Sequence, residues 1–97
     1  MSFVEKLNVD VFLMGVDGID IEKGITFNSY EESVVAERVA VNASRRIVLA
    51  DDSKFGVVAP YRVVDIDGVD YIVTNESERT RKIRRFLEAS GVNLVFA

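Results

Sequence analysis

The fold is decided by one apolar run, residues 9–14 (VDVFLM), which Gly15 ends. A run this rich in β-branched and aromatic residues predicts a strand buried on both faces, as in parallel sheets. Downstream, residues 29–32 (SYEE) have the spacing of a capping box, in which the serine hydroxyl and the glutamate carboxylate satisfy free N–H groups of a helix. We expect that helix to run to about residue 43 and a second strand to follow at 46–50, which makes a right-handed βαβ unit.

The rest of the chain continues the alternation of strands and helices. Residues 15–24 are expected to form a long loop, and loops of that length in compact domains are usually functional. The Asp67-Gly68 pair predicts either a hairpin turn or a short connection between parallel strands. Further elements are expected at 57–59, 61–64 and 69–74 (extended), 79–90 (helix, ended by Gly91) and 92–96 (strand).

Two sets of side chains are expected to be buried on the helices. The first helix is expected to bury a broad apolar face of Val34, Val35, Val39 and Ala40, together with Ala36, Val41 and Ala43. The second helix is expected to bury Ile83, Phe86 and Leu87. The fold class is therefore α/β, a Rossmann-like, mostly parallel sheet with flanking helices in one domain over residues 1–97. Because both ends of the chain fall close to buried strands, we expect this region to be part of a larger domain.

Composition excludes several kinds of site. The 97 residues include no Cys and no His, which excludes zinc centres, haem, iron–sulfur clusters, Ser-His-Asp triads and thiol nucleophiles. We accordingly expect no cofactor and no metal. A net charge of -4 argues against nucleic-acid binding by this chain itself. The chain lacks a signal-peptide pattern and any apolar run near the roughly 20 residues of a membrane helix, so we expect a soluble cytoplasmic protein.

Polar turns follow the first two predicted strands, at residues 15–18 and 51–54. In open parallel sheets, ligands bind outside the carboxyl ends of the strands. Carboxylates there can accept hydrogen bonds from sugar hydroxyls, and Lys54 can bind a phosphate or a carbonyl oxygen. The two turns together predict a site for a phosphorylated sugar or polyol. The alternative is that these residues only form turns and helix caps.

Three other motifs have simpler explanations. Glu32 has the position of an acid–base carboxylate, but the capping box accounts for it. Residues 65–70 are similar to a calcium loop and lack its twelfth-position ligand, so we favour a turn. The basic run 79–85 could contact phosphate or nucleic acid, but its i,i+4 pairs with acidic residues favour a solvated helix face.

Several stretches together resemble a known family. They are residues 8–20 (NVDVFLMGVDGID), 24–26 (GIT), 31–35 (EESVV) and 45–56 (RRIVLADDSKFG), with the strand–helix–strand that ends at residue 97. Over nearly all of its own length, the chain resembles the C-terminal half of the effector-sensing domain of DeoR-type bacterial transcriptional repressors. The resemblance implies a three-layer α/β fold similar to ribose-5-phosphate isomerase and the CoA transferases.

The resemblance also implies a site and its partners. In the family, a D-G-x-D loop and a D-x-S-K turn border the ligand site. The loop corresponds here to Asp17, Gly18 and Asp20, which would contact ligand hydroxyls. In the turn, Lys54 would contact ligand oxygens or phosphate, and Asp52 and Ser53 would shape the turn. The expected partners are a phosphorylated sugar effector and further copies of the chain, with no membrane. DNA would be bound only through a helix-turn-helix that this sequence lacks.

An enzymatic alternative follows from the same resemblance. A ribose-5-phosphate isomerase-like fragment would use Glu32 or Asp17 as base and Lys54 as electrophile. Residues 23–26 match the Gly-rich segment of those isomerases poorly. We therefore expect a binding domain and no enzyme. A third interpretation is a purely structural association piece, since a chain cut at buried strands would expose apolar edge surface and self-associate through it.

Overall fold

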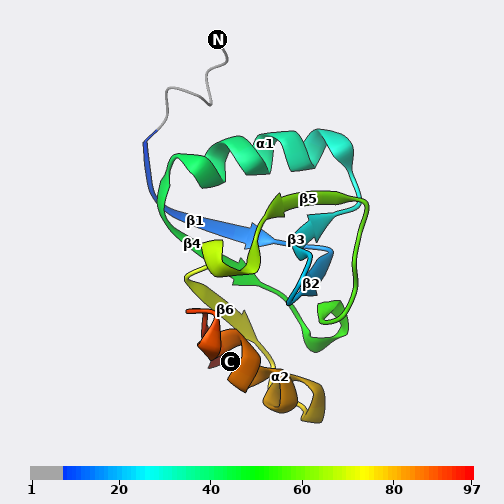
Figure 1. Cartoon of the computed structure of the whole chain (residues 1–97). Helices are drawn as coiled ribbons and strands as arrows, with labels where there is room; N and C mark the ends of the chain where they lie inside the picture. Colours follow the sequence, from blue (N-terminus) through cyan, green and yellow to red (C-terminus); the bar gives the residue numbers. More distant parts are fainter. Residues whose placement is uncertain (1–7) are drawn as a thin grey trace.

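The computed structural model describes residues 8–97. These residues form seven strands, two α-helices and two short 3-10 turns. Three strands precede α1, three more lie between α1 and α2, and one follows α2; Figure 1 shows their arrangement in space. In chain order the elements are β1 (Val9–Gly15), β2 (Gly18–Asp20), β3 (Gly24–Phe27), α1 (Tyr30–Val41), β4 (Ala43–Leu49), η2 (Asp52–Lys54), β5 (Tyr61–Val64), η3 (Ile66–Gly68), β6 (Tyr71–Thr74), α2 (Glu78–Ala89) and β7 (Asn93–Phe96).

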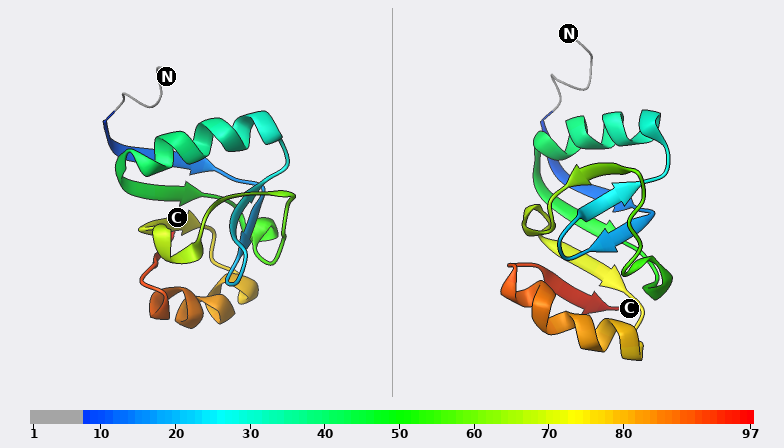
Figure 2. Two further views of the ribbon diagram at one scale, coloured as in Figure 1. Left: turned by 45° about the horizontal axis from the view of Figure 1, so that its top comes forward. Right: turned by 45° about the vertical axis from the view of Figure 1, so that its right-hand side comes forward.

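The main sheet consists of four parallel strands in the order β1-β4-β6-β7. The chain therefore crosses this sheet in one direction, from β1 to β7 (Figure 2). Residues 14, 48, 72 and 94 occupy neighbouring positions of the register. The prediction of an α/β fold with a mostly parallel sheet and flanking helices is confirmed.

A second, antiparallel sheet joins β2, β3 and β5. The prediction of a loop over residues 15–24 is wrong, because β2 and β3 form a hairpin there. The Asp20 carboxylate accepts hydrogen bonds from the backbone N–H groups of Glu22 (3.0 Å) and Lys23 (2.9 Å), and Gly24 adopts φ 76°. Both features stabilise the hairpin turn.

The Asp67-Gly68 pair does not form a hairpin turn. These residues lie in η3, and the strands on either side of it, β5 and β6, belong to different sheets. Arg46 contacts this turn from β4: its guanidinium donates to the carbonyl oxygens of Gly68 (2.6 Å), Ala40 (2.8 Å) and Ala43 (3.0 Å). One side chain thus joins the end of α1, the start of β4 and η3.

The core lies on one face of the main sheet. Met14, Val48, Ile72 and Leu94 point toward it, where they pack with residues of both helices and of the small sheet. The prediction that the first strand is buried on both faces is wrong, since Leu13 on the other face is 58% exposed. Right-handed crossovers that all step in one direction place their connections on the same face of a sheet, which explains this asymmetry.

Helix α1 packs through small residues. Ser29 caps it by accepting from the N–H of Glu32 (3.3 Å). Among the described residues, the Glu32 carboxylate accepts no hydrogen bond from the Ser29 N–H, so the second half of the predicted capping box is absent. The buried positions of α1 are Ser33, Ala36 and Ala40, one stripe at i, i+3 and i+7. The predicted burial of Ala36 and Ala40 is confirmed, whereas that of Val34, Val35 and Val41 is wrong, because all three valines are exposed.

Ser77 is the N-cap of helix α2 and forms a capping box with Thr80. Leu87 is fully buried, as predicted, but Phe86 is 59% exposed and its predicted burial is wrong. Gly91, with φ 87°, follows the helix end as predicted. Neither described helix is long and apolar enough to cross a membrane.

Candidate functional site

The two predicted turns lie at the same edge of the main sheet. β1 and β4 run parallel, and Gly15 pairs with Leu49 at the last position of their register. The turns that follow these strands therefore begin side by side. We call the edge formed by residues 15–20, 50–57 and 75–79, at the carboxyl ends of β1, β4 and β6, the carboxyl rim.

The first turn is tightly held by backbone contacts. The Asp17 carboxylate accepts from the N–H of Asn28 (2.8 Å), and the Asp17 N–H donates to the Thr26 carbonyl (3.2 Å). Gly18 is buried, and a Cβ at that position would lie 2.3 Å from the Val57 carbonyl oxygen and 2.5 Å from Thr26 Oγ1. Only glycine therefore fits at this position. Asp20 lies at the other end of β2, where its carboxylate holds the hairpin turn.

The second turn is the 3-10 turn η2, capped by Asp51. The Asp51 carboxylate accepts from the N–H of Ser53 (2.8 Å) and from its hydroxyl. The hydrogen bonds from the hydroxyl and then the N–H of Ser53 lower the pKa of Asp51, with a smaller contribution from the charge of Lys54. Asp51 is thus an ionised cap. Sequence reasoning assigned this turn to Asp52 and Ser53 and did not identify Asp51 as the residue that holds it.

The two turns are joined directly. Ile19 and Phe55 form a parallel bridge, and the Gly56 N–H donates to the Ile19 carbonyl (2.8 Å). The D-G-x-D segment therefore packs along the segment that leaves η2. Lys54 is half-buried there, and its ammonium makes no ion pair with any residue that the structure describes. Its charge acts on the neighbouring Asp51 carboxylate without forming an ion pair, and a half-buried ammonium in that state is suited to bind an anion.

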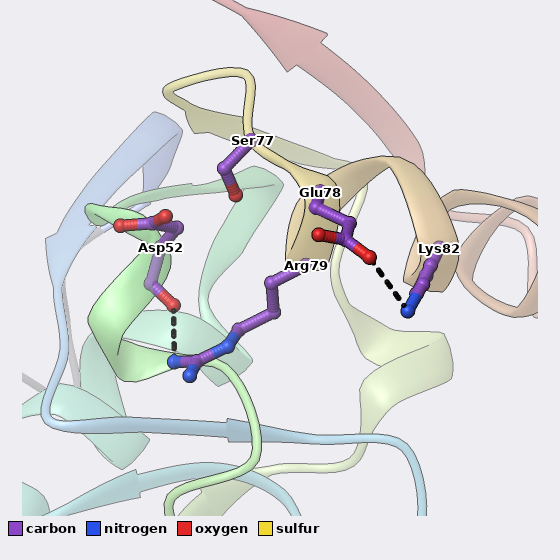
Figure 3. A pocket seen from close by; sticks show the side chains of 5 residues that line it. All are labelled: Asp52, Ser77, Glu78, Arg79 and Lys82. Carbon is purple, nitrogen blue, oxygen red and sulfur yellow. Dashed lines mark hydrogen bonds and ion pairs between the residues drawn. The ribbon is translucent and has the colours of Figure 1, made fainter.

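A third strand contributes residues that sequence reasoning did not assign to the rim. Asn75, after β6, accepts from the Asp52 N–H (2.9 Å) through its Oδ1 atom, and Arg79 Nη1 donates to the Asp52 carbonyl (3.2 Å). An open hollow of about 640 Å³ lies between η2 and the start of α2, lined by Asp52, Ser77, Glu78, Arg79 and Lys82. Figure 3 shows Arg79 extending across this hollow toward Asp52, while Glu78 pairs with Lys82 at 3.0 Å.

One sequence signal could have identified Asn75 and Arg79. β6 was predicted as a strand, and a third parallel strand places its carboxyl end at the same edge as the other two. Glu32, the alternative base, lines a different hollow together with Phe12, Gly15 and Phe27. That hollow and the one beside Asp52 have no lining residue in common. Among the described residues, no group of three or more Asp and Glu side chains is arranged to hold a metal ion.

Comparisons with known proteins agree with the resemblance. The family model described as "DeoR C terminal sensor domain" matches residues 1–76. The HTH-type transcriptional repressor GlcR of Bacillus subtilis is 33% identical over 97 residues, covering 97% of this chain and 37% of that protein. The HTH-type transcriptional regulator GlpR of Haloferax volcanii is 27% identical over 94 residues, covering 97% of this chain and 36% of that protein.

A third relative is the deoxyribose operon repressor of Escherichia coli K12, which is 30% identical over 78 residues, covering 77% of this chain and 31% of that protein. The chain thus spans about a third of the length of these three curated relatives. The aligned regions are their C-terminal portions.

Proposed function

Since this chain belongs to the family of DeoR C-terminal sensor domains, which are regulatory and not enzymatic, we propose that it binds a phosphorylated sugar at the carboxyl rim. The observation that carries the proposal is the direct joining of the two polar turns, the second of which carries Lys54, whose ammonium makes no ion pair with a described residue. The names of two relatives support a ligand of this class, since one represses a glycerol-3-phosphate regulon and another a deoxyribose operon.

The proposed site consists of Asp17, Gly18, Asp20, Asp52, Ser53 and Lys54. In this proposal the Lys54 ammonium binds the phosphate or another anionic oxygen, and the carboxylates of Asp17 and Asp52 accept from ligand hydroxyls. Gly18, Asp20 and Ser53 act through shape. Gly18 allows the turns to touch, Asp20 holds the hairpin, and Ser53 fixes η2 through Asp51.

The regulatory step is a population shift. A sugar phosphate that binds one arrangement of the sensor more tightly than another favours that arrangement and so changes the affinity of the regulator for its operator. Residues 1–97 form, in this proposal, the C-terminal part of a cytoplasmic, homo-oligomeric DeoR-type sensor. DNA contact belongs to a helix-turn-helix outside this sequence.

A titration followed by amide NMR tests the site. The full 97-residue chain would be titrated with sugar phosphates of three to six carbons, with the matching sugars lacking phosphate, and with inorganic phosphate. We expect shifts concentrated at residues 15–20 and 50–57 with the sugar phosphates. Inorganic phosphate should bind more weakly, because it lacks the hydroxyls that the carboxylates accept from.

Two lysine variants serve as matched probes in that titration. Lys54→Ala removes a charge-assisted hydrogen bond worth about 1.5–3 kcal/mol, so affinity should fall about 10- to 100-fold. Lys23→Ala removes the same charge from the exposed hairpin turn and should leave affinity unchanged. Equal affinity of the Lys54 variant and the wild type, or shifts that avoid both turns, would show that the site is assigned wrongly.

A further inference from the structure

The 3-10 turn η2, which carries Lys54, has only weak hydrogen bonds of its own between backbone groups. The N–H of Lys54 donates to the Asp51 carbonyl at 3.2 Å, and the N–H of Phe55 donates to the η2 carbonyl three residues before it at 3.3 Å. Both distances lie at or beyond the long end of the usual range, and 3-10 turns have poorer hydrogen-bond geometry than α-helices. No residue of η2 is buried, so the core does not hold the turn. Its conformation therefore depends on its cap and on contacts from neighbouring segments.

One residue of η2, Asp52, is bound at both of its backbone groups by the segment that follows β6. The Oδ1 atom of Asn75 accepts from the Asp52 N–H at 2.9 Å, and Arg79 Nη1 donates to the Asp52 carbonyl at 3.2 Å. Figure 3 shows the second contact, with the arginine side chain extended across the hollow. We call these two hydrogen bonds the Asp52 clamp. Because the N–H and the carbonyl belong to different peptide groups, the clamp fixes the backbone on both sides of Asp52.

The side chains of the Asp52 clamp are themselves fixed by the start of α2. The carbonyl of Asn75 accepts from the Thr80 hydroxyl at 3.0 Å, and that hydroxyl accepts from the Ser77 N–H at 2.8 Å. Thr80 is fully buried, and Arg79 lies in the first turn of the capped helix. The clamp thus joins an exposed turn to a helix whose first turn is anchored in the core.

The structure gives Asn75 and Arg79 no other evident task. Both are exposed, so neither side chain contributes to the core. Among the residues that the structure describes, Arg79 forms no ion pair, although the neighbouring Glu78 forms one with Lys82 at 3.0 Å. The guanidinium donates instead to a backbone carbonyl of η2. The contact with η2 is therefore what distinguishes Arg79 from the other basic residues of α2.

We propose that Asn75 and Arg79 are positioning residues of the carboxyl rim, which hold η2 in the arrangement in which Lys54 binds the anionic group of the ligand. This inference rests on the proposed function and adds two residues to its site. The clamped residue lies two positions before Lys54, so the clamp fixes the backbone from which the ammonium extends. A site that is ordered before the ligand arrives binds more tightly, because binding does not have to supply the ordering.

The expected effect follows from the population of the ordered turn. When only a fraction of the molecules has the binding arrangement, the apparent affinity falls by that fraction. Loss of either hydrogen bond of the Asp52 clamp should reduce this fraction to about one fifth, which corresponds to about 1 kcal/mol, the net contribution of one hydrogen bond. Asn75→Ala and Arg79→Ala should therefore each lower the affinity for a sugar phosphate about fivefold.

Nuclear magnetic relaxation of backbone ¹⁵N in the full 97-residue chain, without ligand, tests the clamp itself. Rigid backbone has order parameters of about 0.85, and flexible backbone has values below about 0.6. Residues 52–54 should be rigid in the wild type and should approach the flexible range in Asn75→Ala and Arg79→Ala. Asn75→Asp keeps an acceptor oxygen at the same place and should keep the order of the wild type. Far-UV circular dichroism verifies that the variants fold.

Arg85→Ala is the matched control for charge. Arg85 is exposed on α2 outside the carboxyl rim, so its removal should change neither the order of η2 nor ligand affinity. The three alanine variants are then titrated with the sugar phosphate that binds the wild type most tightly. Asn75→Ala removes no charge, so a loss of affinity equal to that of Arg79→Ala supports positioning over direct contact with the anion.

Three results would overturn the positioning role. They are unchanged order parameters at residues 52–54 in both clamp variants, a loss of affinity without a loss of order, and a loss of affinity in Arg79→Ala alone. In the last two cases the side chains contact the ligand directly. A wild-type chain that binds no sugar phosphate refutes the proposed function instead, and the relaxation data, which need no ligand, still decide whether the Asp52 clamp orders η2.

Discussion

Gly18→Ala is the most direct test of how the carboxyl rim is built. The added Cβ would lie 2.3 Å from the Val57 carbonyl oxygen and 2.5 Å from Thr26 Oγ1. One of these atoms belongs to the backbone, so the segment after η2 must move by about 1 Å to restore an ordinary contact. That movement disturbs two hydrogen bonds, from the Gly56 N–H to the Ile19 carbonyl (2.8 Å) and from the Ala59 N–H to Thr26 Oγ1 (2.9 Å).

The destabilisation follows from these contacts. Overpacking costs about 1–3 kcal/mol, and each of the two disturbed hydrogen bonds about 1 kcal/mol, so the free energy of unfolding should fall by about 3–5 kcal/mol. For a domain of this size each kcal/mol lowers Tm by about 4–8 °C. Gly18→Ala should therefore lower Tm by roughly 15 °C or more.

Gly15→Ala is the matched control, since a Cβ at Gly15 meets nothing within 4 Å. Its effect should stay within about 0.5 kcal/mol. Urea unfolding followed by circular dichroism at about 5 μM, with sugar-phosphate affinity measured on the folded variants, compares the two. If both glycine variants unfold at the same urea concentration, the close contact between the turns is not what holds the rim together.

Three further predictions concern stability. Arg46→Met should cost about 2–3 kcal/mol by leaving three carbonyl groups without their donor, whereas Arg85→Met on exposed α2 surface should change urea stability by less than about 0.5 kcal/mol. Asp51→Asn should lower Tm at pH 7, because it removes an ionised cap. The folded state lowers the pKa of Asp51 from 3.8, so the stabilisation by the ionised carboxylate exists above that pH and is lost below it; the Tm values of variant and wild type should therefore converge as pH falls. Thr80→Val should cost about 1–2 kcal/mol in urea unfolding, since the buried Thr80 hydroxyl accepts from one backbone N–H of the capping box and donates to a backbone carbonyl.

The strands of the main sheet were predictable from local pattern, and their burial was not. The apolar run of β1 predicts a strand correctly, but the same run suits a covered face and an open one. Whether Leu13 is buried depends on where every later crossover passes, which is a property of the whole topology. The β2–β3 hairpin was not predicted, because its strands have only three and four residues and begin at glycines.

Helix α1 shows a different limit of sequence patterns. The burial of Ala36 and Ala40 was predicted, but the valines predicted beside them are exposed. Small residues allow the helix to approach the sheet closely, so Ser33 is buried with the two alanines. The site was predicted in part for a topological reason: turns after parallel strands share one edge. The position of Arg79 at this site was not predicted, because its contact with the Asp52 carbonyl spans 27 residues and depends on how α2 packs beside η2.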